Sequence, residues 1–223
     1  MNILMTGASR GIGLEFVRQL SQKDHKIVAA CRHPEEAREL QELAKASGGR
    51  VRVIAADVED EHALEILATE AERLGSIDLL INNAGMYPEG ESAEDFERGF
   101  RVNSIAPYLI TQRLLTFLKK SKHPKALFLT SMMGSIADNT SGGSVAYRAS
   151  KTALNMMVRC LTLAEPWLTT VLMHPGWVKT RMGGPDALIS TTESVQGMLR
   201  VVDGLKLEDS GSFIDYEGDG LPW

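Results

Sequence analysis

The sequence has few cysteines, few aromatic residues and no long apolar run. Two cysteines, Cys31 and Cys160, are too few for the disulfide framework of a small secreted domain and fit a reducing compartment. No apolar stretch is long enough to cross a bilayer, and the first residues lack the basic and apolar regions of a secretory signal. These absences predict a cytoplasmic protein that does not bind membranes.

Two further absences argue against metal and nucleic-acid binding. The five histidines are scattered without the spacing of a metal site, so no metal ligands are predicted. The net charge of −5 gives no general attraction to nucleic acid. The basic stretch at 119–125 is better explained as a solvated helix end, where cations lie near the negative pole of the helix dipole. The 223 residues, 43% of them hydrophobic, fit one globular domain over residues 1–223.

Short apolar runs rich in β-forming residues alternate with longer amphipathic stretches along the chain. We expect strands at 2–6, 26–31, 51–56, 77–82, 125–131, 168–174 and 211–215. We expect helices at 11–23, 34–47, 60–74, 93–120, 145–165 and 191–205. Pro34 suits the first turn of its helix, and Ser92 with Asp95 suits a capping box. Apolar strands joined by helices predict a single doubly wound α/β domain of the Rossmann type, with a mostly parallel sheet of about seven strands.

Three glycines follow the first expected strand and open the first expected helix. They lie in TGASRGIG, residues 6–13, with the spacing G-x-x-x-G-x-G, which differs from the common G-x-G-x-x-G fingerprint. Glycine permits a tight turn and a close backbone approach, and a helix N-terminus attracts a pyrophosphate. A glycine cluster alone often marks only a turn, but the strand-to-helix context favours dinucleotide binding.

The end of the second expected strand bears on the choice of dinucleotide. It reads Ala29-Ala30-Cys31-Arg32, without the acidic residue that usually holds a ribose 2′-hydroxyl. The guanidinium groups of Arg10 and Arg32 are able to bind a 2′-phosphate, unless both simply face solvent. The sequence therefore favours NADP(H), with NAD(H) as the alternative.

Further motifs follow in order: NNAG at 82–85, Asn103, Ser131, YRASK at 147–151 and HPGWVKT at 174–180. This ordered set resembles the short-chain dehydrogenase/reductase family over essentially the whole chain. The tail FIDYEGDGLPW more particularly resembles the family's C-factor and sniffer-like carbonyl-reductase branch. The resemblance implies a catalytic tetrad of Asn103, Ser131, Tyr147 and Lys151. It also implies cofactor contacts from Gly7, Ser9, Arg10, Gly11, Ile12, Gly13, Arg32, Asp57, Val58, Asn83, Ala84, Gly85, Tyr147, Lys151, Pro175, Gly176, Val178 and Thr180.

Each member of this tetrad also has an ordinary structural explanation. Asn103 could satisfy a local backbone group, and Ser131 could end a strand. Tyr147 could be a half-buried packing residue, and Lys151 a solvated helix cation. Ser135 is the second candidate for the serine, because it lies in the same loop after the strand. Taken together and in this order, the four residues favour catalysis.

Tyr147 and Lys151 are one helical turn apart and so share a helix face. A free tyrosine has a pKa of about 10, and a nearby lysine cation favours the phenolate. We therefore expect Lys151 to bring the pKa of Tyr147 towards neutral pH, where it acts as a general acid or base. The resemblance implies that Ser131 binds the carbonyl oxygen, that Lys151 also holds the nicotinamide ribose, and that Asn103 supports a water-linked proton path.

The leading hypothesis is an NADPH-dependent oxidoreductase that reversibly reduces a small-molecule aldehyde or ketone to an alcohol. One alternative is a nucleotide-binding signalling or regulatory protein of the C-factor type with little or no turnover, and a sugar epimerase is a third. The helices at 93–120 and 145–165 could form a family-like interface, so a homodimer or homotetramer is expected. The terminal Leu-Pro-Trp is expected to dock against the domain or a partner subunit, the alternative being a frayed terminus. Six residues could line an apolar substrate pocket or equally be core or lid packing: Met86, Tyr87, Met132, Met133, Trp177 and Met182.

Overall fold

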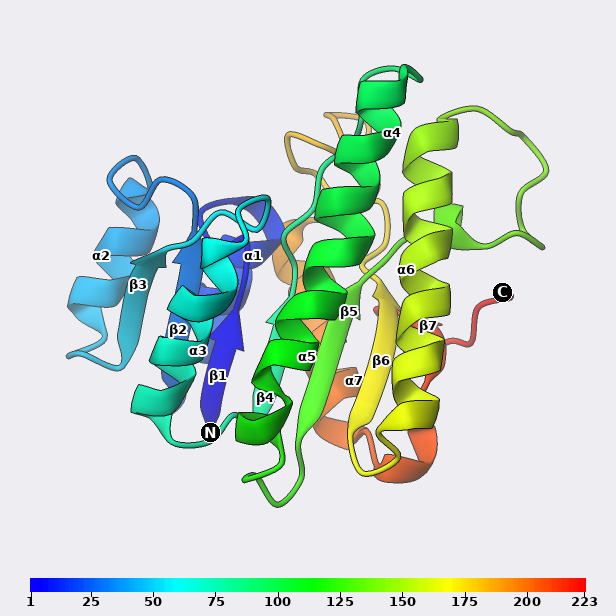
Figure 1. Ribbon diagram of the computed structural model, residues 1–223. Helices are drawn as coiled ribbons and strands as arrows, with labels where there is room; N and C mark the ends of the chain where they lie inside the picture. The colour runs from blue at the N-terminus through cyan, green and yellow to red at the C-terminus, as the bar shows by residue number, and fades with distance from the viewer.

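Seven strands form one parallel sheet in the computed structural model, which describes residues 1–223 (Figure 1). The strands are β1 (Asn2–Met5), β2 (Lys26–Cys31), β3 (Val51–Ala55), β4 (Leu79–Asn82), β5 (Lys125–Leu129), β6 (Thr169–His174) and β7 (Ser212–Asp215). The helices are α1 (Gly11–Leu20), α2 (Arg38–Ala46), α3 (His62–Leu74), α4 (Ala93–Phe100), α5 (Ala106–Leu118), α6 (Val145–Ala164) and α7 (Thr191–Gly204). The expected doubly wound α/β fold with a seven-stranded parallel sheet is confirmed.

Two apolar cores lie on opposite faces of the sheet. Side chains alternate along each strand, so Ile3 and Met5 of β1 join one core while Leu4 joins the other. The first core also takes buried residues from α1, α2 and α7, and the second takes them from α3, α5 and α6. Because both faces are covered, the strands are apolar almost throughout, as the sequence pattern predicts.

The strand order is β3-β2-β1-β4-β5-β6-β7, so the chain returns from one edge to the middle of the sheet between β3 and β4. The direction of winding reverses between β1 and β4, which pair in parallel with Met5 opposite Ile81. The carboxyl ends of strands at such a reversal are where open α/β sheets bind ligands. The glycine turn follows β1 and the NNAG motif begins at the end of β4, so the fold brings both motifs to this point.

Two expected helices differ from the structure. Residues 34–37 form a turn rather than the first turn of a helix, because Ala37 leaves the helical region at φ −85° and ψ 62° and is buried in the core. The helix therefore begins at Arg38. The expected helix at 93–120 is interrupted between α4 and α5 by a π-helical turn, η1 (Arg101–Ile105). The capping box at Ser92 and Asp95 is confirmed.

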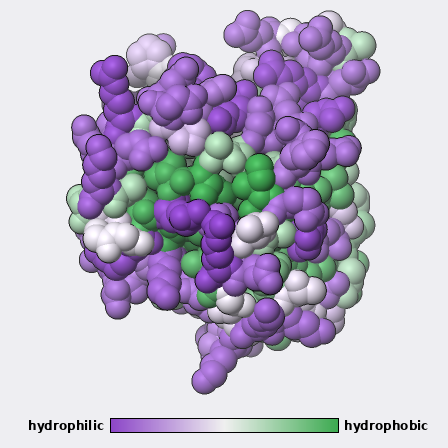
Figure 2. Space-filling view, turned by 60° about the vertical axis from the view of Figure 1, so that its left-hand side comes forward, coloured by the Kyte–Doolittle hydropathy of each residue, from purple (hydrophilic) through white to green (hydrophobic).

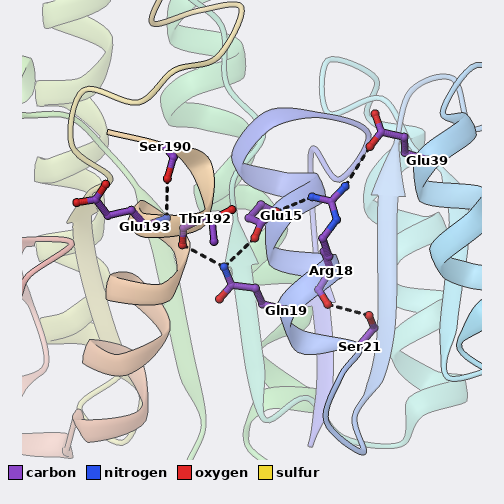
Figure 3. Close-up of polar contacts among 8 residues, drawn as sticks. All are labelled: Glu15, Arg18, Gln19, Ser21, Glu39, Ser190, Thr192 and Glu193. Carbon is purple, nitrogen blue, oxygen red and sulfur yellow. Dashed lines mark hydrogen bonds and ion pairs between the residues drawn. The ribbon is translucent and has the colours of Figure 1, made fainter. Parts of the chain in front are cut away.

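Polar contacts fix α1 between its neighbouring helices (Figure 3). Arg18 donates a hydrogen bond to the buried Glu15 within α1 and another, of 3.0 Å, to Glu39 of α2. Gln19 donates to Glu15 and to the backbone oxygen of Thr192 in α7. These bonds hold the helix whose first turn faces the candidate site.

The edge strand β3 is protected by charge. Arg52 on β3 donates to Glu70 of α3 at 2.6 Å, and Glu70 also pairs with Arg73. Figure 2 brings forward the side of the molecule that carries α2 and β3, and it shows apolar residues framed by hydrophilic ones. Charged side chains along an exposed edge oppose pairing with a further strand.

The C-terminal residues dock on the domain, as expected. The ring of Trp223 lies 5.7 Å from that of Phe213 in β7. The backbone nitrogen of Leu221 donates to Phe213, and the backbone oxygen of Trp223 accepts from Ala137 at 2.9 Å. The tail therefore ties β7 to the loop that follows β5.

None of the helices has both the length and the apolar character needed to cross a bilayer.

Candidate active site at the carboxyl edge of the sheet

The glycine turn packs too closely against its neighbours to admit side chains. Gly7 has a φ of +69°, which glycine adopts readily, and a Cβ at Gly13 would lie only 2.1 Å from the backbone oxygen of Gly7. Asn83 clamps this turn by donating to the backbone oxygens of Thr6 and Gly7 at 3.0 and 2.9 Å. The glycines therefore serve close packing of the turn, the first helix and the NNAG segment.

The N-terminus of α1 is suited to an anion. Arg10 precedes the helix in an extended conformation, no side chain caps the first turn, and no acidic residue lies in it. A helix leaves its first backbone N–H groups without partners inside the helix, and these groups attract phosphate. The turn that contains Ser9, Gly11 and Ile12 therefore fits the pyrophosphate of a dinucleotide.

Three arginines gather beside the glycine turn. Burial lowers the pKa of Arg10, and the charges of Arg181 and Arg32 lower it further. Arg181 lies near the glycine turn because the preceding residue, Thr180, packs on it. A Cβ at Gly11 would lie 3.3 Å from the Thr180 methyl group. Mutual repulsion of like charges makes this cluster favourable for an anion. Sequence reasoning included Arg10 and Arg32 but missed Arg181, which directly follows the family-implied Thr180.

Arg32 is not a free cation. Its guanidinium lies 3.7 Å from the carboxylate of Glu59, while Arg98 of α4 binds the same carboxylate at 2.8 and 3.1 Å. Since Arg98 already holds Glu59 in two hydrogen bonds, Glu59 does not depend on Arg32, whose side chain is 44% exposed. Arg32 is therefore able to turn towards a phosphate.

The remaining expected cofactor residues lie along the same edge. Asp57 and Val58 follow β3, where Asp57 accepts a hydrogen bond from the Glu59 nitrogen. Ala84 is fixed by a hydrogen bond from its nitrogen to the Thr6 hydroxyl at 3.1 Å. The segment after β6 is held by two interactions: Ser194 donates to the Pro175 oxygen, and Val178 forms a β-bridge with Ile189. Between them, Gly176 adopts a φ of +82°.

Asn103 lies in the π-helical turn and is almost fully buried. Its amide accepts from the Met86 nitrogen and donates to the Met86 oxygen, both at 2.9 Å, and also donates to Ser150 at 3.0 Å. The structure thus shows the backbone-satisfying contacts that were the alternative explanation for this residue. A Cβ at Gly85 would lie 3.4 Å from Asn103 Oδ1 and 3.8 Å from Lys151 Nζ, so Asn103 and Lys151 lie close together.

Ser131 is fixed by a short helical turn, η2 (Met132–Gly134), that packs on α6. Its hydroxyl accepts from the Met133 nitrogen. Gly134 lies against α6, and its oxygen accepts from Thr152 at 3.0 Å and from Asn155 at 3.3 Å. Sequence reasoning missed Thr152 and Asn155, although both follow the YRASK motif on the same helix.

Ser135, the second candidate serine, has a different use. Its side chain is buried, and its hydroxyl accepts from the Asp138 nitrogen within the loop. The Ser131 hydroxyl, in contrast, interacts with the phenol of Tyr147 and lowers its pKa. Ser131, whose hydroxyl acts on the Tyr147 phenol, is therefore the better candidate than Ser135.

Tyr147 and Lys151 do not influence each other as the sequence suggested. Burial raises the pKa of Tyr147 to about 12, against the opposing interaction with Ser131. Burial lowers the pKa of Lys151 to about 8. The Lys151 ammonium donates to the Leu129 oxygen at 2.8 Å and lies 5.9 Å from the centre of the Tyr147 ring. The expected lowering of the Tyr147 pKa by Lys151 is wrong for this arrangement, because loss of solvation outweighs the distant charge.

The six apolar candidates for substrate contact all lie outside the buried cores. Tyr87, Trp177 and Met182 are exposed at 41%, 50% and 51%, and the other three are partly exposed. The Trp177 indole donates to the Gly183 oxygen at 2.8 Å, which fixes its ring on the loop after β6. Their exposure rules out the core-packing explanation and leaves them available to a ligand.

Comparisons with known proteins agree with this arrangement. Residues 1–187 match the model of the short chain dehydrogenase family. C-signal of Myxococcus xanthus is 47% identical over 156 residues, which cover 67% of this chain and 94% of that protein. The NADPH-bound carbonyl reductase from chicken fatty liver has a TM-score of 0.94 and 36% identity, covering 100% of this chain and 98% of its own.

A second solved structure has an equally similar fold. The carbonyl reductase Sniffer of D. melanogaster has a TM-score of 0.94 and 28% identity, with 100% of this chain and 99% of its own covered. The resemblance to the C-factor and sniffer-like branch is therefore confirmed. By sequence and by structure, this chain belongs to the short-chain dehydrogenase family of oxidoreductases.

Proposed function

We propose that this protein is an NADPH-dependent carbonyl reductase that converts an aldehyde or ketone to an alcohol, reversibly. The observation that carries the proposal is the interaction of the Tyr147 phenol with the Ser131 hydroxyl, beside a glycine turn shaped for a dinucleotide. A phenol and a hydroxyl that converge in this way are able to bind one carbonyl oxygen. The carbonyl reductases with similar structures support this choice of reaction.

NADPH bound along the carboxyl edge of the sheet would supply the hydride. Gly7, Gly11 and Gly13 with the start of α1 would hold its pyrophosphate, and Arg10 and Arg32 would hold its 2′-phosphate. Asp57 and Val58 would lie near the adenine. The cofactor would pass beside Asn83, Ala84 and Gly85. Its nicotinamide would be flanked by Pro175, Gly176, Val178 and Thr180. The NADPH-bound state of the chicken enzyme supports this cofactor.

The protein's own residues would handle the proton. Because the pKa of Tyr147 is about 12, its phenol stays protonated at neutral pH and is ready to donate. Ser131 would orient the carbonyl oxygen, and the phenol would protonate it as negative charge develops there. Lys151 in its charged form would stabilise the phenolate left behind and would hold the nicotinamide ribose. Asn103 would fix the backbone at Met86 and, with a water molecule, link Lys151 to solvent.

The reductive rate is expected to fall as pH rises through about 8, because Lys151 has a pKa of about 8 and only its cation stabilises the phenolate. Tyr147 adds no loss below its own pKa of about 12. The check is kcat for carbonyl reduction measured from pH 6 to 10. Lys151→Arg keeps its charge throughout this range, so the remaining activity of this control should show no step near pH 8. A parent profile that is flat through pH 8 would contradict the role given to Lys151.

Arg32→Asp is expected to weaken NADPH binding about tenfold or more, with a smaller effect on NADH, because it removes one charge-assisted hydrogen bond and adds repulsion. Dissociation constants for both cofactors at matched ionic strength provide the measurement. Arg113→Asp is the control, since Arg113 is also an exposed arginine paired with a glutamate, Glu65, on the α3–α5 surface. An equal loss for both cofactors, or equal affinities in the parent, would defeat this assignment.

The 47% identity to C-signal favours one second candidate, a nucleotide-binding regulator with little or no turnover. Two measurements separate the functions. NADPH oxidation is followed with a broad panel of aldehydes and ketones, and NADPH binding is measured alongside it. Turnover supports the reductase, whereas tight NADPH binding without turnover across the panel supports the regulator. The same assay with NADH measures the cofactor preference directly.

The proposal includes the cytoplasm as location and a homodimer or homotetramer as assembly. Cys31 and Cys160 are unpaired, which fits a reducing compartment. Leu109 of α5 and Met156 and Leu163 of α6 are exposed apolar side chains on the two helices expected at the interface. Their exposure supports the assembly, because a second copy packed on these helices would bury them.

A further inference from the structure

The loop between β4 and α4 crosses the start of α6, the helix that carries Tyr147. The ring of Tyr87 in this loop lies against the ring of Tyr147, with centroids 4.8 Å apart and planes tilted by 39°. The Tyr87 hydroxyl forms a hydrogen bond with the Ser144 hydroxyl at the N-cap of α6. Tyr87 is therefore held at both its ring face and its phenol oxygen.

Ser144 has an unusual backbone. Its φ of 48° and ψ of 43° make it the only non-glycine residue in the chain in the left-handed region. A non-glycine residue keeps such a conformation only where surrounding contacts hold it. Gly142 and Gly143 before it also have positive φ, and neither has a neighbour that a Cβ would touch. The contact with Tyr87 supplies one such restraint on Ser144, in addition to the hydrogen bonds that Arg148 donates to the backbone oxygens of Gly142 and Gly143.

The crossing loop is itself anchored on both sides of Tyr87. Pro88 is buried, and a Cβ at Gly99 of α4 would lie 3.2 Å from its ring. Glu91 accepts a hydrogen bond from the Val145 nitrogen at 3.0 Å, one residue after Ser144. Tyr87 is therefore fixed in place rather than lying on a free loop.

We propose that Tyr87 is a specificity-determining residue of this site: its exposed ring is a wall on which flat, aromatic aldehydes and ketones stack, and Ser144 latches that ring in position. This inference rests on the proposed carbonyl reduction. One face of the Tyr87 ring is used by Tyr147, and the side chain is still 41% exposed, so ring surface remains for a ligand. A latched ring loses little freedom when a ligand stacks on it, which favours binding.

Tyr87 also influences the group that would donate the proton. Its presence beside the phenol raises the pKa of Tyr147, in addition to the larger effect of burial. The Tyr87 ring therefore borders the group that would donate the proton. One side chain would select the substrate by shape and help to keep the acid protonated.

The test compares two ligands of equal ring size that differ in flatness, benzyl alcohol and cyclohexylmethanol, titrated into the NADPH-loaded protein. We expect benzyl alcohol to bind about three- to tenfold more tightly, the scale of one aromatic stacking contact. Tyr87→Leu should bring the two dissociation constants to within about twofold, whereas Tyr87→Phe retains the ring and part of the preference. Equal affinities in the parent, or an unchanged preference in Tyr87→Leu, would overturn the inference.

The latch is tested by a double-mutant cycle on the same ratio of dissociation constants. Tyr87→Phe and Ser144→Ala each remove the same hydrogen bond, so each should lower the preference and the double variant should lower it no further. Additive losses would show that Ser144 does not hold the ring. Thermal melting confirms that each variant is folded.

Turnover separates this inference from the proposed function. The ratio of kcat/KM for benzaldehyde to that for cyclohexanecarbaldehyde should fall in Tyr87→Leu by the same three- to tenfold factor, about one stacking contact. If no carbonyl is reduced by the parent, the proposed function fails, yet the dissociation constants still decide whether Tyr87 selects flat ligands. If carbonyls are reduced with no change in this ratio, the function stands and the role of Tyr87 fails.

Discussion

Tyr147→Phe is expected to lower the turnover of carbonyl reduction by about 10²-fold or more, the scale of a lost general acid. The substitution removes only the phenol oxygen. The ring that packs against Tyr87 remains, so the fold and NADPH binding should be retained. Turnover is measured with saturating NADPH, alongside cofactor affinity and thermal melting.

Tyr108→Phe is the matched control for this experiment. Tyr108 lies on α5, and its hydroxyl accepts a hydrogen bond from Gln112 of the same helix. Loss of that hydroxyl should leave turnover within about twofold of the parent, because no proton passes through it. Near-normal turnover in a folded Tyr147→Phe protein would reject Tyr147 as the acid, even if the reductase assignment survived.

Gly13→Ala is expected to destabilise the protein by more than about 3 kcal/mol, at the upper end of overpacking. The new methyl group would lie 2.1 Å from the Gly7 backbone oxygen and 2.6 Å from the Asn83 side chain, so no rotamer change relieves the clash. Either α1 moves off the turn or the turn opens, and the two hydrogen bonds from Asn83 are strained. Urea unfolding monitored by circular dichroism measures the loss.

Gly204→Ala provides the control for Gly13→Ala, since it makes the same chemical change at the end of α7 where a Cβ would touch nothing. Alanine is the better helix former by about 1 kcal/mol, so stability should stay equal or rise by up to that amount. A Gly13→Ala protein as stable as the parent would show that the turn has room to adjust and that the close approach is not structurally required.

The Rossmann-type sheet follows from local patterns. The apolar runs predicted all seven strands to within two residues at each end. The same reasoning missed the start of α2 and the π-helical turn, because both depend on contacts from elsewhere. Ala37 is drawn into the core, and Asn103 exchanges two hydrogen bonds with the distant Met86 backbone. Hydrophobic periodicity continues through residues 93–118 and carries no sign of the contact between Asn103 and Met86.

The candidate site divides in the same way. The glycine turn followed from its spacing after a strand, whereas Ser131, Tyr147 and Lys151 were singled out by the family resemblance that the ordered motifs carry. Sequence did not reveal Arg181, Thr152, Asn155 or the latch between Tyr87 and Ser144. Each of these joins segments separated in the chain, so its partner is visible only once the sheet has brought the loops together.

The sequence by itself determined the layered fold, the family and the chemical groups available at the site, since these depend on residue type, spacing and order. Only the tertiary structure decided how those groups behave. Burial sets the pKa of Tyr147 at about 12 and that of Lys151 at about 8, opposite to the effect expected from their one-turn spacing. The physical reason is solvation: the spacing gives the distance between two charges, whereas the surrounding fold determines how much water each one loses.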